Sequence, residues 1–295
     1  MAQVIVTGAE SFIGKRLLNL LDARNIPYIG IDLVPSTRKN VFQGSIQSKE
    51  LTHIIPDNPD AIIHLAALSR DPDCRNQGYK CFDINVLGSL NLIDIAEKKK
   101  AKQFIFASTE WVYDNFVPGQ PNDENTEICP ARLKSEYAFS KFVTEVNLRQ
   151  KFNHGFCPTT ILRFGIIYGP RKANWSAVES LFYSVKQSNE INISSRQTGR
   201  CFVHVDDIVE AIVLSLGLSG FEIINIQNDR LITLGDILDT SQRLFKKKIK
   251  IIETDPNHPS VRLISNFKAK NLLRWSPKLG LEAGLQSLEP EYFNA

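Results

Sequence analysis

The chain has 295 residues, enough for about two domains of average size or for one large α/β domain. Apolar residues make up 43% and charged residues 23%, a globular composition that excludes long disordered stretches. The 35 basic and 32 acidic side chains leave a net charge of +3. This balance excludes a general nucleic-acid binder, although a small anionic ligand needs only local positive groups.

The five cysteines are widely spaced and odd in number, which argues against a disulfide framework and against a zinc site, so we expect no metal. The first strand pattern begins at Gln3 without a basic segment before it, and no apolar run reaches the ~18 residues of a membrane span. We therefore expect a cytoplasmic protein that is not associated with a membrane.

Short β-branched runs alternate with longer helical patterns in the first half of the chain. We expect strands at residues 4–7, 28–32, 61–65, 103–107 and 159–163, and helices at 13–25, 79–100 and 133–151. Alternation of helices with apolar strands predicts an α/β fold, with a parallel sheet covered on both faces.

The alternation of strand and helix patterns becomes less regular after about Gly169. There we expect strands at residues 191–194, 221–226 and 249–253, and helices at 206–218 and 233–246. We divide the chain into a first domain, residues 1–168, and a smaller α/β region, residues 169–295, that packs on it without a linker.

The segment from Gly8 to Gly14 (GAESFIG) lies between the first strand and the first helix. Gly8 permits a tight turn, Gly14 permits close helix packing, and the N–H groups of the helix start face a pyrophosphate. Ser11 replaces the middle glycine of this dinucleotide-binding pattern, but its small side chain and hydroxyl are compatible with a phosphate. Phe12 and Ile13 complete the predicted contact segment.

Asp32 ends the second strand. A carboxylate there accepts hydrogen bonds from the adenosine ribose hydroxyls and repels a 2′-phosphate, which favours NAD over NADP. Arg38, six residues later, moderates this preference.

Tyr137 and Lys141 are four residues apart on an expected helix, and therefore on one face. A lysine ammonium stabilises a phenolate and prepares it for acid–base catalysis. Ser108 and Thr109 end the fourth strand, at the sheet edge where such folds bind ligands, so a hydroxyl there would bind the substrate oxygen. Tyr168 and Lys172 repeat the spacing, but Gly169 and Pro170 exclude a helix.

An ordered set of segments carries a resemblance to a known family. They are residues 7–14, 64–67 (HLAA), 85–88 (NVLG), 108–113, 137–141, 168–170 (YGP), 202–207 (FVHVDD) and 268–275. The chain resembles the extended short-chain dehydrogenase/reductases, in particular the NAD-dependent epimerases and dehydratases of nucleotide sugars. The resemblance implies a Rossmann-type, doubly wound sheet with a smaller C-terminal substrate domain, and a homodimer formed through two helices of the first domain.

By this resemblance Tyr137 is the catalytic base, Lys141 also holds the nicotinamide ribose, and Thr109 matches the catalytic Ser/Thr. The cofactor cleft is implied to include Leu65, Ala66 and Ala67. Arg200 matches an arginine that contacts the substrate diphosphate.

Several positions depart from the family pattern. Ile166 replaces an asparagine that grips the nucleotide sugar, Ser45 replaces an adenine-contacting aspartate, and Arg274 replaces a late glycine. A second diphosphate arginine is missing from residues 255–259, and Arg262 is the candidate to compensate. Binding of a nucleotide sugar is therefore less firmly indicated than binding of the cofactor.

Thr109 is followed by Glu110 and Trp111, where the family's dehydratases carry two acids. Because an indole cannot act as a base, dehydration is disfavoured. Glu110 is either an acid of the substrate pocket or a solvated turn residue. We expect structural functions for His64 and His204, the latter beside Asp206 and Asp207, which resemble a pair of helix N-caps.

The sequence thus predicts an NAD-dependent epimerase of a nucleotide sugar, acting at C4 through a transient 4-keto intermediate. Two alternatives remain open. One is an NAD(P)H-dependent reductase of a nucleotide-linked 4-keto-6-deoxy sugar, and the other is a dinucleotide-binding protein without catalysis.

Overall fold

The computed structural model describes residues 3–173 and 175–289. They form two compact units. The first comprises residues up to Asn115, Thr126–Phe164 and Val209–Ile224, and the second comprises Phe116–Asn125, Gly165–Ile208 and residues from Asn225 onward. The units are therefore interleaved along the chain, because residues 116–125 join the second unit and residues 209–224 return to the first.

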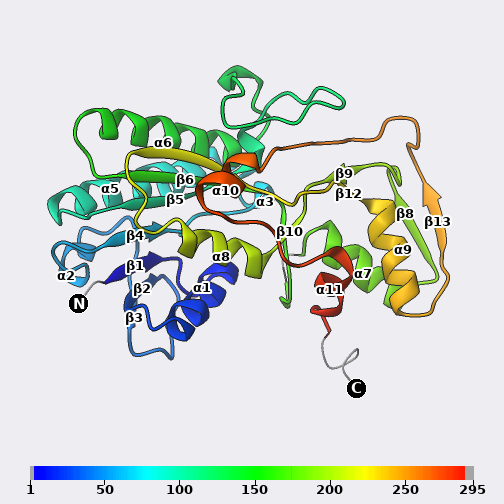
Figure 1. The fold of residues 1–295 in the computed structure, drawn as a ribbon, viewed down its shortest axis with the longest axis horizontal. Helices are drawn as coiled ribbons and strands as arrows, with labels where there is room; N and C mark the ends of the chain where they lie inside the picture. The colour runs from blue at the N-terminus through cyan, green and yellow to red at the C-terminus, as the bar shows by residue number, and fades with distance from the viewer. Residues whose placement is uncertain (1–2, 174, 290–295) are drawn as a thin grey trace. The chain divides into compact units, whose positions relative to one another are not determined.

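A seven-stranded sheet organises the first unit (Figure 1). Its strands are β1 (Val4–Thr7), β2 (Tyr28–Asp32), β3 (Val41–Gln43), β4 (Ala61–His64), β5 (Phe104–Thr109), β6 (Thr159–Phe164) and β11 (Phe221–Ile226), in the order β11-β6-β5-β4-β1-β2-β3. Neighbouring strands among β1 to β6 pair in parallel, and the interior strands are almost wholly buried. The expected Rossmann-type sheet is confirmed, and the short strand β3 is an addition to it.

Helices cover both faces of this sheet. They are α1 (Phe12–Ala23), α2 (Leu51–Ile54), α3 (Asp71–Cys74), α4 (Gly78–Phe82), α5 (Ser89–Lys98), α6 (Glu136–Asn153) and α8 (Val205–Leu214), the last shared between the units. Figure 1 shows α5 and α6 over one face and α1 over the other. Leu92, Ile93 and Leu148 pack with Phe104 and Phe106 of β5 in one core cluster.

Two helices differ from their expected form. The segment expected as one helix over 79–100 contains a π-helical turn, Asp83–Gly88, between α4 and α5. The helix expected from residue 133 begins at Glu136, because the hydroxyl of Ser135 caps it by accepting the N–H of Ala138 at 3.3 Å.

The second unit contains short strands and helices around its own core. They are β7 (Ile167–Tyr168), α7 (Ala177–Gln187), β8 (Glu190–Ile193), β9 (Gly199–Arg200), β10 (Val203–His204), β12 (Ile232–Thr233), α9 (Leu234–Leu244), β13 (Lys250–Glu253), α10 (Phe267–Leu272) and α11 (Leu281–Gln286). Tyr168, Phe182, Phe202 and Ile237 belong to one buried cluster.

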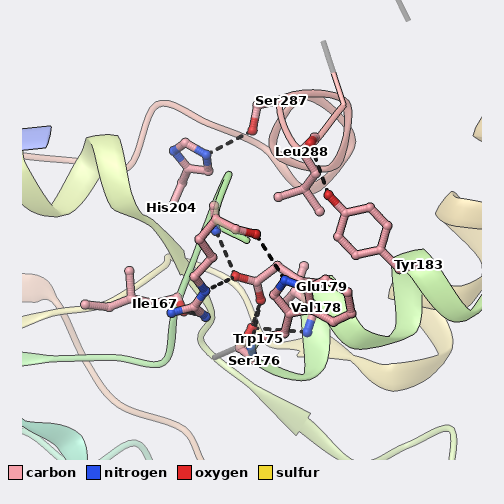
Figure 2. A network of polar contacts seen from close by, with 11 residues as sticks. Ile167, Trp175, Ser176, Val178, Glu179, Tyr183, His204, Ser287 and Leu288 are labelled. Atoms are coloured by element: carbon pink, nitrogen blue, oxygen red, sulfur yellow. Dashed lines mark hydrogen bonds and ion pairs between the residues drawn. The ribbon is translucent and has the colours of Figure 1, made fainter. Parts of the chain in front are cut away.

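A buried carboxylate, Glu179 of α7, organises the turn after β7 (Figure 2). It accepts the N–H of Gly169 at 3.2 Å, the guanidinium of Arg171 at 2.7 Å and the N–H of Ser176 at 2.9 Å. The Ser176 hydroxyl donates to it as well and completes a capping box. Gly169 has φ 152°, and no residue from Tyr168 to Lys172 is helical, which confirms that Tyr168 and Lys172 do not share a helix.

Candidate active site

The glycine loop has the backbone that a dinucleotide site needs. Gly8 has φ 72°, a left-handed conformation that glycine adopts without strain, and a Cβ there would lie 2.8 Å from the N of Ala66. A Cβ on Gly14 would lie 2.1 Å from the carbonyl oxygen of Gly8, so the helix can start this close to the turn only with glycine. Ser11 caps α1 by accepting the N–H of Gly14 at 3.0 Å, which places Phe12 and Ile13 in the first turn.

The loop lies at the point where the strand order reverses. From β1 the chain builds outward through β2 and β3 on one side, and β4 pairs with β1 on the other. The carboxyl ends of two such strands bound the crevice in which these folds bind ligands. Leu65 donates its N–H to the carbonyl of Thr7 at 3.1 Å, and Ala66 adjoins Gly8. The structure therefore brings residues 65–66 beside the glycine loop.

Asp32 is held firmly at the end of β2. Its Oδ2 accepts the N–H of Glu10 at 2.8 Å and its Oδ1 accepts the N–H of Val34 at 3.0 Å. Arg38 is engaged elsewhere, because its guanidinium donates to Asp22 at 2.5 Å and to the hydroxyl of Tyr28 at 2.8 Å. The cation that moderated the preference for NAD is thus bound to a carboxylate of α1.

Thr109, Tyr137 and Lys141 come together at the carboxyl end of β5. The side chains of Thr109 and Tyr137 are hydrogen bonded, and Lys141 lies one turn along α6. Burial raises the pKa of Tyr137 above its ordinary value, while the bond to Thr109 lowers it. The resting phenol is therefore protonated, and its conversion to a base requires additional positive charge nearby.

Lys141 is buried with little compensation for its charge. Its Nζ donates to the carbonyl of Ala107 at 2.8 Å and lies 4.7 Å from the ring centroid of Phe106. Burial lowers the pKa of Lys141 to about 8. At neutral pH the side chain is still mostly cationic, so it can stabilise a phenolate at Tyr137.

Ser108 does not join this group. Its hydroxyl donates to the carboxylate of Glu145, which forms a buried ion pair with Arg163 at 2.6 Å. Arg163 also donates to the hydroxyl of Tyr113 at 3.1 Å. Sequence reasoning did not single out Glu145 or Arg163, although an arginine inside an apolar strand calls for a buried partner.

Two cysteines that are seven residues apart also meet near the tyrosine. The thiols of Cys74 and Cys81 are buried, and they donate to the carbonyls of Leu68 at 3.9 Å and Glu136 at 3.7 Å. Both also act to raise the pKa of Tyr137, which burial raises most. Asn85 donates to the sulfur of Cys81 at 3.6 Å and to the hydroxyl of Ser140 at 3.0 Å. These residues form the packing behind the start of α6.

Glu110 directly follows Thr109 in a short 3₁₀ turn, Glu110–Val112, and is only 1% exposed. The alternative that it is a solvated turn residue is therefore wrong. A buried acid beside Thr109 is compatible with the other alternative, an acid of the substrate pocket.

The two candidate diphosphate arginines lie on neighbouring segments of the second unit. Arg200 donates to the carbonyl of Ser260 at 2.6 Å, and the backbone N–H of Arg262 donates to the carbonyl of Gly199 at 3.2 Å. Cys201 and Leu263, the residues that follow them, line a cavity of about 280 Å³. The structure thus brings the two arginines onto adjoining segments, but neither side chain lines the cavity: the Arg200 guanidinium is bonded to Gly199 and Ser260, and that of Arg262 lies 5.3 Å from the ring centroid of Phe116.

Both histidines are hydrogen bonded inside the protein. His64 contacts the hydroxyls of Thr7 at 2.8 Å and Ser89 at 2.9 Å. Burial, aided by the charge of Lys141, lowers its pKa to about 3, so the ring is neutral. Within residues 3–173 and 175–289, no cluster of histidines, cysteines and acids suited to a metal is found.

His204 contacts the hydroxyl of Ser287 at 3.0 Å (Figure 2), and its Nδ1 accepts the N–H of Asp206 at 3.2 Å. Because α8 begins at Val205, Asp206 and Asp207 lie in its first turn. The expectation that these two aspartates cap the helix is therefore wrong, and His204 supplies the capping contact. Asp207 instead accepts the N–H groups of Lys278 at 2.9 Å and Leu279 at 3.2 Å.

Comparison with known proteins agrees with this geometry. Residues 4–226 match the model of the NAD dependent epimerase/dehydratase family. The chain is 26% identical to the UDP-glucuronate 4-epimerase of Thermodesulfobacterium geofontis, covering 97% of this chain and 94% of that one. It is 27% identical to the dTDP-4-dehydro-6-deoxyglucose reductase of Escherichia coli, covering 97% and 96%.

Among solved structures, it is similar to the UDP-glucose 4-epimerase of Thermotoga maritima with UDP-glucose. The TM-score is 0.84 at 26% identity, and the match covers 99% of this chain and 98% of that one. The protein belongs to the NAD dependent epimerase/dehydratase family, and it is an NAD-dependent enzyme. No helix in the described part of the chain is long and apolar enough to cross a membrane.

Proposed function

We propose that the protein is an epimerase of a nucleotide sugar that inverts C4 through a transient 4-keto sugar. The observation that carries this proposal is the Thr109–Tyr137 hydrogen bond beside the buried Lys141. Relatives of this chain named as 4-epimerases support it. Arg200 and Arg262, which lie on adjoining segments of the second unit, supply positive groups suited to the substrate diphosphate.

The residues of the first unit fit a bound dinucleotide, because the left-handed turn at Gly8, the crowded Gly14 and the fixed Asp32 form its expected cradle. When bound, NAD supplies reversible hydride acceptance and a positive charge. In that state the positive charges of the cofactor and of Lys141 would favour loss of the Tyr137 proton to solvent. The phenolate so formed would take the proton of the 4-hydroxyl, and Thr109 would orient the same oxygen. Tyr137 returns the proton after the keto sugar has presented its other face.

The test is turnover on a panel of nucleotide sugars, with the epimers separated by chromatography. The wild type should interconvert 4-epimers without net consumption of cofactor. Tyr137→Phe should lower kcat by about 10²–10⁴, the contribution of general acid–base catalysis, and leave NAD affinity nearly unchanged. Retention of activity in this variant would contradict the assignment of Tyr137.

The second candidate is a reductase of a 4-keto-6-deoxy nucleotide sugar, which is favoured by the similarity to the Escherichia coli reductase. It would use the same three residues. It differs in consuming one reduced cofactor for each sugar, so mass spectrometry of the dinucleotide released by denaturing the protein distinguishes the two. Retained NAD supports the epimerase, whereas an empty protein that oxidises NAD(P)H with a 4-keto sugar supports the reductase.

We also propose a homodimer formed through the π-helical turn before α5 and through α6. Leu87 is 57% exposed, Phe139 is 40% exposed and Val146 is 42% exposed, and the last two lie seven residues apart on one face of α6. Solvent exposure of large apolar side chains on adjacent helices is typical of a subunit interface. Sedimentation should give twice the mass of the chain, and Phe139→Glu should give the monomer. A wild-type monomer at high concentration would contradict this proposal.

A further inference from the structure

Glu10 joins the glycine loop to the carboxylate that ends β2. Its backbone N–H donates to Oδ2 of Asp32 at 2.8 Å. Its own carboxylate is hydrogen bonded to the side chain of Ser36 and lies 3.1 Å from Nζ of Lys15. The Glu10 side chain is 14% exposed, so these contacts are partly shielded from water.

Ser36 belongs to the segment that leaves β2 after Asp32. Its Oγ accepts the N–H of Arg38 at 3.1 Å, which leaves the hydroxyl proton for Glu10. The bond to Ser36 and the charge of Lys15 together lower the pKa of Glu10, against the opposing effect of burial. Glu10 is therefore an anion at neutral pH. Its carboxylate connects the glycine loop to Ser36, in the segment that follows Asp32.

Two cations of this region, Lys15 and Arg38, are engaged by carboxylates. Lys15 is paired with Glu10, and Arg38 is paired with Asp22 on α1. A 2′-phosphate on the adenosine ribose lies close to the carboxylate at the Asp32 position, and it requires positive groups that neutralise about two charges. Glu10 adds a second carboxylate to the loop whose backbone N–H contacts Asp32.

We propose that Glu10 is a second specificity-determining residue that, together with Asp32, selects NAD against NADP. It acts in two ways. Its carboxylate repels a 2′-phosphate, and its ion pair holds Lys15, which would otherwise be available to that phosphate. This selectivity concerns the cofactor alone and does not depend on which sugar the enzyme uses.

The direct test is calorimetric titration of the cofactor-stripped full chain with NAD, with NADP and with 2′,5′-ADP. Glu10→Gln keeps a side chain that can bond Ser36 but removes the charge. We expect NADP to bind about tenfold more tightly and NAD to change less than about threefold, as one partly screened like-charge interaction is removed. Glu10→Lys should favour NADP by a further factor of about ten.

Two further variants distinguish repulsion of the 2′-phosphate by Glu10 from a merely structural contribution of Glu10 to the glycine loop. Ser36→Ala removes the hydrogen bond but keeps the charge, so the ratio of NADP to NAD affinity should stay as in the wild type. Adding Lys15→Gln to Glu10→Gln should remove part of the gain in NADP binding, because the released cation is lost. Raising the ionic strength should bring the NADP and NAD affinities of the wild type closer together, and should do so less for Glu10→Gln.

If Glu10→Gln leaves the affinity ratio unchanged, or weakens both cofactors alike in a folded protein, Glu10 only supports the loop and the proposal is overturned. A variant that still binds NAD is folded at this site, so the NAD titration is also the folding control. Neither result affects the assignment of Tyr137, because these titrations contain no sugar and measure no turnover.

Discussion

Two buried cations of the first unit differ in how far their charges are compensated. Arg163 is paired with Glu145, bonded to Tyr113 and stacked 5.0 Å from the centroid of that ring. Lys141, one helical turn from Glu145, is bonded to a backbone carbonyl, and among the described residues it forms no ion pair, although the charge of Glu145 acts on it without contact. The pKa of Arg163 is raised by Glu145 despite burial, while burial lowers that of Lys141 to about 8.

This difference matches what each group does. A satisfied ion pair fixes the ends of β5 and β6, because Ser108 and Arg163 are register partners and both bond Glu145. The charge of Lys141 is only partly compensated, because burial outweighs the effect of Glu145, and it is available to a phenolate formed at Tyr137. Active sites commonly retain such unfavourable groups at a cost in stability, and the surrounding structure holds them in place.

The largest expected effect follows from breaking the satisfied pair. Glu145→Gln leaves the Arg163 guanidinium buried without its counter-charge, which should lower the free energy of unfolding by about 3–5 kcal/mol. Urea unfolding followed by circular dichroism measures the change.

The matched control is the double variant Glu145→Leu with Arg163→Met, which replaces the pair by apolar side chains of similar length. It should recover much of the lost stability, since an apolar replacement removes both desolvation costs. If Glu145→Gln unfolds at the wild-type urea concentration, the pair does not hold the strands and the contrast with Lys141 fails.

The comparison also shows which parts of the site the sequence could predict. The spacing of Tyr137 and Lys141 places them on one helical face, and Thr109 follows from the end of a strand. Ser108 was grouped with Thr109 because the two are adjacent in sequence. Successive strand residues point to opposite faces, however, and that alternation separates Ser108 from the tyrosine.

Glu145 was not predicted from the sequence, for a different reason. A glutamate within a helix usually lies on a solvated face, and only the depth of α6 against β5 and β6 makes this one buried. The fold itself was predicted well where strands are long and apolar. The π-helical turn and the three-residue strand β3 were not, because both depend on tertiary packing more than on local periodicity.

Substitution of Lys141 should have a smaller effect on the free energy of unfolding than Glu145→Gln, and of opposite sign. Lys141→Met should abolish most turnover and yet raise the free energy of unfolding at neutral pH by about 2 kcal/mol. A shift of the pKa from 10.5 to about 8 corresponds to about 3 kcal/mol of burial cost, and the lost bond to the Ala107 carbonyl offsets about 1 kcal/mol of the gain.

The pH dependence of the free energy of unfolding tests the sign of the Lys141→Met effect independently. The folded pKa lies below the unfolded value, so the burial cost is present in full below about pH 8 and disappears as the pH rises toward 10.5. The stability advantage of Lys141→Met over the wild type should therefore shrink across this window, as measured by urea unfolding at each pH. A constant difference, or a less stable variant at pH 7, would mean that the surroundings of Lys141 compensate its charge as fully as Glu145 compensates that of Arg163.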